Sequence, residues 1–285
     1  MKLTQIKKND EMILGIVTDQ GIIDVSAEAE RRGIKAPKTM LEVIRGGDEA
    51  LTVLRALEMD PVCYAEGTPA PVVTGGEKIL CIGLNYRRHA KECNLPLPPA
   101  PVLFNKFSNS LAADGDVITL MPDYKEYDYE AELVAVIGKT CRNVTEEEAL
   151  KYVFGYTCGN DLSTRDLQFA RSNQWLLSKT LDGFAPIGPC VVTADSINPN
   201  DLHISSRVNG QLRQDSRTSD MIFTTAQIIA DLSRHFPLMP GDMIFTGTPQ
   251  GVMHGYPADR KDWLKPGDQV EVIIEGIGTL HTSFC

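Results

Sequence analysis

Three Gly-Asp pairs, each followed at once by an apolar run, constrain the fold of this chain more than any other feature. They are Gly115-Asp116, Gly241-Asp242 and Gly267-Asp268. A Gly-Asp pair is typical of a tight turn, and a strand that follows a turn directly lacks the crossover helix that parallel βαβ units require. The three pairs therefore predict an antiparallel or mixed sheet in an α+β fold dominated by β-structure.

Apolar runs from Lys78 onward extend this pattern. They predict strands over residues 79–83, 102–104, 130–137, 153–158, 191–193, 243–246 and 270–274. Helical spacing is less frequent in this part of the chain and predicts helices over residues 146–152, 164–171 and 225–236. Strands thus outnumber helices in the larger part of the chain.

The start of the chain shows a different pattern. Met12–Val17 and Gly21–Val25 predict a β-hairpin, because a four-residue turn joins two short apolar runs. Two short helices are expected next, with Ser26 and Thr39 as candidate N-caps. The segment Glu66–Glu77 is rich in Gly and Pro and is typical of a linker. We therefore expect a small α/β N-terminal domain over residues 1–72 and a second domain over residues 73–285.

Composition excludes several classes of function. With 28 Lys and Arg against 38 Asp and Glu, the chain has a formal net charge of −10, which disfavours binding to nucleic acid. No apolar run approaches the roughly 20 residues that span a bilayer, and no export signal is recognised, so no membrane partner is expected. The seven cysteines are scattered without a C-x-x-C pair, and the five histidines form no familiar zinc-enzyme motif. This pattern favours free thiols in a cytoplasmic protein.

Three carboxylates are candidates for a metal site. Glu130 and Glu132 share one face of a predicted strand, and Asp161 stands at the end of the next strand. Like charges on a partly buried face are costly unless a proton or cation lies between them. Oxygen donors alone suit a hard ion such as Mg²⁺, Mn²⁺ or Ca²⁺. The alternative is an exposed edge strand with solvated glutamates.

Basic and amphoteric groups accompany these acids. If a helix begins after Tyr86, His89 and Glu92 are spaced at i and i+3 and can form an oriented general base. A surface cluster of charged side chains is equally compatible with that sequence. Lys179 follows an apolar stretch and is either poised for an anion or simply extends from a helix end to solvent. The proline-rich segment Asn94–Pro101 is typical of a mobile connection, so the helix with His89 is a candidate lid.

In their order, seven sequence blocks resemble the fumarylacetoacetate hydrolase family over residues 78–284. The blocks are GLNYRRHAKE, PVLFNK, YDYEAELVAVIG, FGYTCGNDLSTRDLQ, QWLLSKTLDGFAPIGP, VNGQLRQDS and GDMIFTGTPQGV. The resemblance implies a C-terminal mixed β-sandwich roll, assembled as a homodimer or a higher oligomer. It also implies a small 2-oxo or 2,4-dioxo acid as substrate.

The same resemblance assigns roles to individual residues. The implied metal ligands for Mg²⁺ or Mn²⁺ are Glu130, Glu132 and Asp161. The implied catalytic residues are His89, Glu92 and Lys179. The implied substrate contacts are Arg165, Gln168 and Thr248. The substrate's tail is expected to contact the lid and the N-terminal domain.

Our first functional hypothesis is a metal-dependent hydrolase that cleaves a C–C bond in 2,4-dioxo acids of the acylpyruvate type, through an enolate of pyruvate stabilised by the metal. The alternatives are an oxaloacetate decarboxylase or tautomerase and a 2-hydroxyhepta-2,4-diene-1,7-dioate isomerase. All of these activities share the chelated 2-oxo acid. A non-enzymatic protein that binds metal and pyruvate is the remaining alternative.

Overall fold

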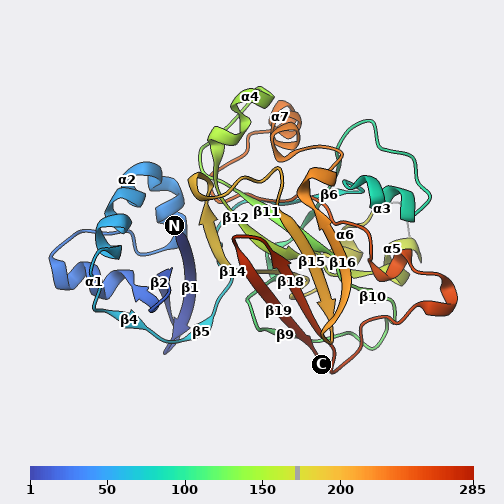
Figure 1. The fold of residues 1–285 in the computed structure, drawn as a ribbon, viewed down its shortest axis with the longest axis horizontal. Helices are drawn as coiled ribbons and strands as arrows, with labels where there is room; N and C mark the ends of the chain where they lie inside the picture. The colour runs from blue at the N-terminus through green and yellow to red at the C-terminus, as the bar shows by residue number, and fades with distance from the viewer. Residues whose placement is uncertain (171–173) are drawn as a thin grey trace.

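Two β-sheets face each other and form the larger part of the molecule (Figure 1). The structure is a computed structural model that describes residues 1–170 and 174–285. Within these residues the larger sheet has twelve strands: β1 (Lys2–Lys8), β2 (Glu11–Thr18), β3 (Gly21–Asp24), β4 (Tyr64–Ala65), β5 (Thr68–Pro69), β6 (Ile79–Gly83), β7 (Val102–Lys106), β8 (Leu111–Ala112), β11 (Ala131–Ile137), β12 (Val153–Asn160), β14 (Ala185–Thr193) and β17 (Met243–Phe245). Its main order is β4-β3-β2-β1-β14-β12-β11-β17-β6-β7.

The second sheet is smaller and has the order β16-β15-β18-β19-β9. Its strands are β9 (Val117–Ile118), β15 (His203–Val208), β16 (Gln211–Arg217), β18 (Gln269–Ile274) and β19 (Gly278–Phe284). Two further short strands pair with each other, β10 (Tyr127–Asp128) and β13 (Ser163–Thr164).

Helices are short, apart from two. The α-helices are α1 (Val25–Arg32), α2 (Met40–Glu58), α3 (Arg87–Glu92), α4 (Glu146–Ala149), α5 (Arg165–Ala170), α6 (Leu176–Lys179) and α7 (Thr225–His235). Single turns of 3₁₀-helix lie at Ser108–Ser110, Leu150–Tyr152, Ala194–Ser196, Thr218–Asp220, Met253–Gly255 and Ala258–Arg260. No helix in the described part of the chain is long and apolar enough to cross a membrane.

The three Gly-Asp turns share one hydrogen-bonding pattern. Their glycines have φ angles of 84°, 94° and 92°, a region that favours glycine. Each aspartate carboxylate accepts the amide N–H three residues before it, at 2.7, 2.8 and 2.9 Å for the pairs Asp116 and Ala113, Asp242 and Met239, and Asp268 and Lys265. The strands β9, β17 and β18 begin directly after these turns. The predicted mixed sheet is confirmed, because β17 pairs antiparallel with β11 and parallel with β6.

The two faces of β11 contribute to two hydrophobic cores. Leu133 packs in the core between the sheets, together with Val272 of β18. Val134 and Val136 face the other way and join a core that includes Leu54 of α2. Since β1 also pairs with β14, the first part of the chain continues both the sheet and the core of the rest. The division into units at residues 72 and 73 stays a prediction.

Most predicted elements are present, with some differences at their ends. Thr39 caps α2 as expected and accepts the Glu42 amide at 3.1 Å. The N-cap of α1 is Asp24, not Ser26, because the Asp24 carboxylate accepts the Ala27 amide at 2.9 Å. The helix expected over 164–171 is α5, and position 171 lies outside the described residues. The strands β1, β15, β16 and β19 lie outside the predicted ranges, because few apolar residues stand next to one another in their sequences.

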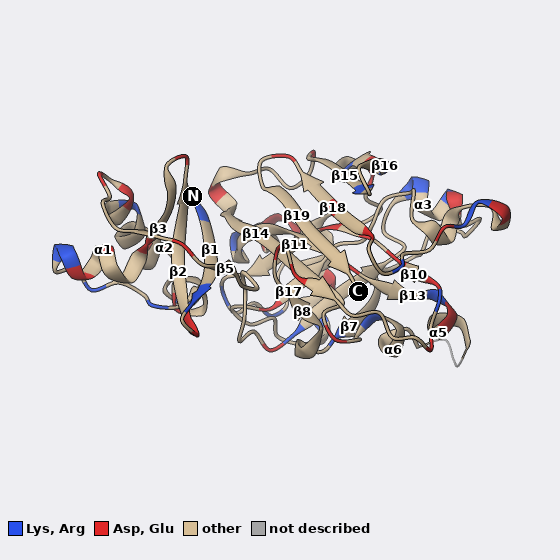
Figure 2. Cartoon of the chain, turned by 90° about the horizontal axis from the view of Figure 1, so that it is seen from below, with Lys and Arg blue, Asp and Glu red and all other residues tan. Residues whose placement is uncertain are grey.

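Figures 1 and 2 place α1 at one end of the molecule and both α3 and α5 at the opposite end. Acidic and basic segments are interspersed along the ribbon between these ends (Figure 2). The predicted lid helix therefore lies far from the N-terminal segment, which bears on how a substrate could be contacted.

Candidate active site

Strand pairing brings the three predicted metal-binding carboxylates together. Glu130 directly precedes β11 and Glu132 lies within it, while Asp161 directly follows β12. Because β11 and β12 are antiparallel neighbours, the end of β12 lies beside the start of β11, and the Asp161 amide donates to the Glu130 carbonyl oxygen at 2.9 Å. One carboxylate oxygen from each residue lies within 4.8 Å of the others, and all three residues are buried.

Two buried lysines lie against these acids. Lys179, at the end of α6, donates from Nζ to Glu130 Oε2 at 2.7 Å and to Asp161 Oδ2 at 3.0 Å. Lys106, at the end of β7, has its Nζ 2.7 Å from Asp161 Oδ1. Its ammonium also donates to three backbone carbonyl groups, those of Leu162, Lys179 and Phe184. A buried ammonium is costly unless it is paired, so the acids and lysines stabilise each other.

Arg165 connects this cluster to a fourth carboxylate, that of Asp128. Its Nε donates to Asp128 Oδ2 at 2.9 Å, its Nη1 donates to Gln168 Oε1 at 2.9 Å, and its Nη2 donates to Glu130 Oε1. Burial would lower the pKa of Arg165, but Glu130 and Asp128 outweigh that effect and raise it. Since each guanidinium nitrogen has a protein partner, Arg165 holds Glu130 and Gln168 in place.

Glu130 and Glu132 have opposite electrostatic environments. Burial would raise the pKa of Glu130, but Lys179 and Arg165 hold it well below its usual range. For Glu132, burial raises the pKa, and the nearby charges of Asp161 and Glu130 raise it further. Its Oε2 accepts the Gly247 amide at 2.8 Å, which compensates only in part. Glu132 is thus a buried carboxylate that a proton or an added cation would stabilise.

This donor set fits a hard divalent cation. All three side chains offer oxygen, which suits Mg²⁺ or Mn²⁺ better than a soft metal. A cation would relieve the repulsion that raises the pKa of Glu132. The residues could therefore hold a metal ion, and which ion they hold remains a prediction.

The predicted pair His89 and Glu92 forms on α3. His89 Nδ1 lies 3.3 Å from Glu92 Oε2, and Glu92 in turn accepts the Gly251 amide at 3.0 and 3.2 Å on its two oxygens. Cys93 lies close by, with Sγ 3.9 Å from His89 Nδ1. Burial would lower the pKa of His89, but its hydrogen bonds with Cys93 and Glu92 raise it to about 9. These two contacts therefore favour the protonated imidazole.

A cavity of about 310 Å³ joins these groups. Eight of the nine predicted site residues line it, namely His89, Glu130, Glu132, Asp161, Arg165, Gln168, Lys179 and Thr248. Glu92 is the exception, because it contacts His89 but is not among the lining residues. Thr248 is oriented by a bond to the Ala131 carbonyl oxygen at 3.0 Å. The structure thus brings the predicted residues together, while their individual roles stay predictions.

One expectation about this cavity is wrong. No described residue from 1–72 lines it, and its lining begins at Ile82. The N-terminal segment lies at the far end of the molecule, so it cannot contact the substrate's tail within the same chain (Figure 1). The other part of that expectation, contact between the substrate and the predicted lid, agrees with the structure. His89, Cys93 and Leu95 of this segment line the cavity.

Sequence reasoning missed three residues of the site. Lys106 ends an apolar strand, which is the same signal that pointed to Lys179. Asp128 is buried and accepts the Met253 and His254 amides at 2.8 and 2.9 Å as well as the Arg165 guanidinium. His254 lines the cavity and stacks on Phe169 with ring centroids 5.1 Å apart. No spacing in the sequence indicates His254.

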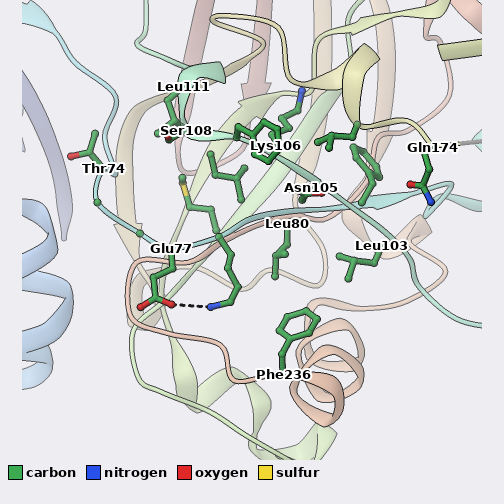
Figure 3. A pocket seen from close by; sticks show the side chains of 18 residues that line it. Thr74, Glu77, Leu80, Leu103, Asn105, Lys106, Ser108, Leu111, Gln174 and Phe236 are labelled. Carbon is green, nitrogen blue, oxygen red and sulfur yellow. Dashed lines mark hydrogen bonds and ion pairs between the residues drawn. The ribbon is translucent and has the colours of Figure 1, made fainter. Parts of the chain in front are cut away.

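A larger cavity of about 860 Å³ lies beside β6 and β7 and is a poorer candidate (Figure 3). Its charged lining residues are already paired. Glu77 and Lys78 form an ion pair at 3.2 Å, Lys78 also reaches Asp242 at 3.1 Å, and Lys106 is paired with Asp161. This lining offers little uncompensated charge for catalysis.

Comparisons with known proteins agree with this geometry. The family described as fumarylacetoacetate (FAA) hydrolase C-terminal matches residues 78–284. A mitochondrial oxaloacetate tautomerase of Rattus norvegicus is 41% identical over 248 residues, covering 86% of this chain and 79% of its own. A fumarylacetoacetate hydrolase structure from Exiguobacterium antarcticum is 35% identical with a TM-score of 0.86, covering 100% of this chain and 99% of its own.

A further structural neighbour contains ligands. The maleylpyruvate hydrolase from Sphingobium sp., in complex with manganese (II) ion and pyruvate, is 29% identical with a TM-score of 0.80 and covers 100% of this chain and 98% of its own. Metal binding in that protein agrees with the carboxylate cluster found here. The prediction of a cytoplasmic location is contradicted, because the rat relative and similar proteins of cattle and human are named as mitochondrial.

Proposed function

The chain belongs to the fumarylacetoacetate hydrolase family of enzymes, and from this premise we propose that it is an oxaloacetate tautomerase. Such an enzyme interconverts the keto and enol forms of a four-carbon 2-oxo diacid. The name of the rat relative supports the choice. The observation that carries it is one cavity that joins the three carboxylates to His89, because enolisation of a 2-oxo acid needs both charge stabilisation and a group that moves a proton.

In this proposal the residues of α3 move the proton. His89, held by Glu92, donates its proton to carbon 3 of the enol form. The electrons of the C2–C3 double bond form the new C–H bond, the enol oxygen loses its proton to solvent, and the C2 carbonyl forms. His89 is suited to this step because its pKa is raised to about 9. The reverse reaction uses the same groups with His89 deprotonated.

The buried cluster opposite α3 would hold the 2-oxo acid end. Glu130, Glu132 and Asp161 would bind Mg²⁺ or Mn²⁺, which when bound stabilises negative charge on the keto and carboxylate oxygens of a 2-oxo acid. Lys179 adds a fixed positive charge beside the same carboxylates. Gln168 and Thr248 line the cavity; the Gln168 side-chain amide can donate a hydrogen bond to the substrate, and the Thr248 hydroxyl, which donates its proton to the Ala131 carbonyl oxygen, can accept one.

A second candidate is hydrolysis of a C–C bond in a 2,4-dioxo acid, our first hypothesis from sequence. The oriented pair of His89 and Glu92 favours it, because such a pair can also deprotonate a water molecule. The similarity to the maleylpyruvate hydrolase favours it too. Hydrolysis ranks second because the rat oxaloacetate tautomerase is 41% identical to this chain and the maleylpyruvate hydrolase is 29% identical.

We also propose that the chain forms a homodimer, as the family resemblance implies. β7 is the last strand of the large sheet, and three large apolar side chains near it are exposed by 41 to 53%, namely Leu103, Phe107 and Leu177. Leu103 (Figure 3) borders the cavity beside β7, which a partner would cover. Phe107 lines the same cavity. Light scattering should show a dimer for the wild type and a shift toward monomer for Phe107→Asp. A wild-type monomer would contradict the proposal.

The function can be tested by measuring three reactions separately, each with added Mg²⁺ or Mn²⁺. We expect the protein to accelerate the change in enol absorbance of oxaloacetate without releasing CO₂. Release of CO₂ would indicate a decarboxylase instead. Release of pyruvate from acetylpyruvate would indicate the hydrolase. If the enol absorbance changes no faster than without protein in either metal, the tautomerase proposal is wrong.

A further inference from the structure

The lid helix α3 presents three different metal-binding atoms on one face. His89, Glu92 and Cys93 are spaced at i, i+3 and i+4, which places their side chains next to one another along the helix. His89 Nδ1 lies 3.3 Å from Glu92 Oε2 and 3.9 Å from Cys93 Sγ. One ligand atom from each of the three residues lies within 4.8 Å of the others.

These separations are close to the edges of a zinc tetrahedron. Zinc binds nitrogen and oxygen at about 2.0–2.2 Å and thiolate sulfur at about 2.3 Å, so neighbouring ligand atoms lie roughly 3.3–3.6 Å apart. The nitrogen–oxygen separation is within that range, and the nitrogen–sulfur separation exceeds it by a few tenths of an ångström. A rotation of the Cys93 side chain could supply that adjustment.

The donors differ in kind from those of the carboxylate cluster. Glu130, Glu132 and Asp161 offer oxygen alone, whereas α3 offers nitrogen, oxygen and sulfur, which select a softer metal such as Zn²⁺ or Co²⁺. A neutral imidazole, a carboxylate and a thiolate also balance the charge of a divalent ion. This balance matters because His89 is buried and Cys93 is half-buried.

The ligand positions are partly fixed. The Gly251 amide donates to both oxygens of Glu92, at 3.0 and 3.2 Å, and so holds the carboxylate against His89. Outer contacts of this kind orient metal ligands and raise affinity. His89 and Cys93 both line the cavity, so a fourth position is open to water or to a substrate oxygen.

We propose that His89, Glu92 and Cys93 form a second metal site, selective for Zn²⁺ over Mg²⁺, which inhibits the enzyme when occupied. Binding forms bonds from the metal to His89 Nδ1, a Glu92 oxygen and Cys93 Sγ, and both the thiol and the imidazole nitrogen lose any proton they carry to solvent. Zinc then replaces the Nδ1 hydrogen bond that orients His89 and takes the place of the Nδ1 proton, so that His89 can no longer alternate between its protonated and neutral forms. The inhibitory part rests on the proposed role of His89, whereas the site itself does not.

Binding can be tested without any assay of activity. The full-length protein is first saturated with Mg²⁺ to occupy the carboxylate cluster, and Co²⁺ is then added while the near-ultraviolet and visible spectra are recorded. We expect a thiolate-to-cobalt charge-transfer band and the visible bands of tetrahedral cobalt, at about one equivalent. Cys93→Ser and Cys93→Ala should lose the charge-transfer band, while Cys285→Ser, which removes an exposed thiol elsewhere, should keep it. No band in the wild type, or a band that persists in both Cys93 variants, would overturn the site.

Inhibition is measured in the same proteins, with each rate expressed relative to that protein without zinc. The zinc concentration that halves the rate should rise by about tenfold or more in Cys93→Ser and stay unchanged in Cys285→Ser. Equal inhibition of all three proteins would show that zinc acts at the carboxylate cluster, and the inhibitory role would be wrong. If no 2-oxo acid is turned over, the proposed function fails, and the cobalt spectra still decide the metal site.

Discussion

The two sides of the cavity are built in different ways. We call Glu130, Glu132, Asp161, Lys106, Lys179 and Arg165 the floor, and His89, Glu92, Cys93, Phe169 and His254 the rim. The floor side chains that form ion pairs with one another are at most 8% exposed. The side chains of His89 and Glu92 in the rim are 10% and 20% exposed. The three acids of the floor are placed by strand register, with Arg165 and Lys179 added from the short helices α5 and α6. The rim lies on α3, the end of α5 and the turn at Met253–Gly255.

This difference suggests how chemistry is divided between them. A floor fixed by paired strands and cross-linked charges can change little without loss of stability. The rim comes from short segments that can be altered more cheaply. We infer that the floor supplies the charge stabilisation common to reactions of 2-oxo acids, while the rim decides which proton moves. The following predictions test that division.

The largest effect is expected for Glu132→Gln in the floor. Without a charge at this position, thermal stabilisation by Mg²⁺ or Mn²⁺ should disappear and turnover should fall by at least about 100-fold. The unfolding free energy of the metal-free protein should hardly change. Burial and the charges of Asp161 and Glu130 already disfavour the ionised form of the carboxylate that this substitution removes.

The matched control is Glu130→Gln, two residues away. Glu130 is paired with Lys179 and Arg165, so its loss takes one of two carboxylate partners from each of these buried cations and should destabilise the metal-free protein by about 3–5 kcal/mol. Chemical denaturation of both variants without metal checks the contrast. Equal destabilisation would show that the two glutamates have the same environment, against the structure.

In the rim, His89→Gln should lower turnover by about 10²- to 10⁴-fold, the usual contribution of a general acid or base. The thermal shift on addition of Mg²⁺ should remain as in the wild type, because the variant leaves the carboxylates intact. Differential scanning calorimetry with and without metal, alongside the enol assay, separates the two effects. A lost thermal shift would mean that the rim and the floor are not independent.

Lys179→Met is expected to have a smaller effect on turnover, about 10²- to 10³-fold, since it removes one fixed charge of several near the keto oxygen. Its loss should appear mainly in kcat, because the charge matters most where negative charge develops. Lys106→Met serves as the comparison. Lys106 contacts Asp161 and three backbone carbonyl groups, so that variant should chiefly lower stability. A change in KM alone for Lys179→Met would contradict this role.

Sequence patterns predicted the floor better than the rim for a physical reason. Alternation along a strand places Glu130 and Glu132 on one face whatever the sheet, and a polar residue after an apolar run marks Asp161 as a strand end. That β12 pairs with β11 in the register Ala131 to Asn160 depends on long-range contacts, which no local pattern contains. Lys106 is different, because it ends an apolar strand and carries the same local signal that pointed to Lys179.

The rim illustrates the opposite limit. The spacing of His89 and Glu92 on a helix is local, so it could be predicted, and the structure confirms their contact. His254 reaches the cavity because Asp128 holds the amides of the 253–254 turn, a contact across 126 residues of chain. Its position depends on the folded floor, so only the structure could reveal it.

His254 gives the smallest and most specific test, because it links rim and floor. Burial, followed by the positive charge of Arg165, lowers its pKa to about 4 from an ordinary value of 6.5. As the pH falls from 6.5 to 4, the unfolded chain binds a proton at this residue that the folded protein does not, so the free energy of unfolding decreases over that window. With solvent screening of a half-buried side chain, we expect a loss of about 1–2 kcal/mol.

The variant His254→Gln cannot bind this proton, so its stability should decrease less than that of the wild type between pH 6.5 and 4. Urea denaturation across that range measures the difference, and pH 7.5 provides the reference at which His254 is neutral in both states. All other titrating groups are shared by the two proteins, so their contributions largely cancel. Parallel curves would mean that neither burial nor Arg165 lowers the pKa of His254, and the electrostatic link between floor and rim would be lost.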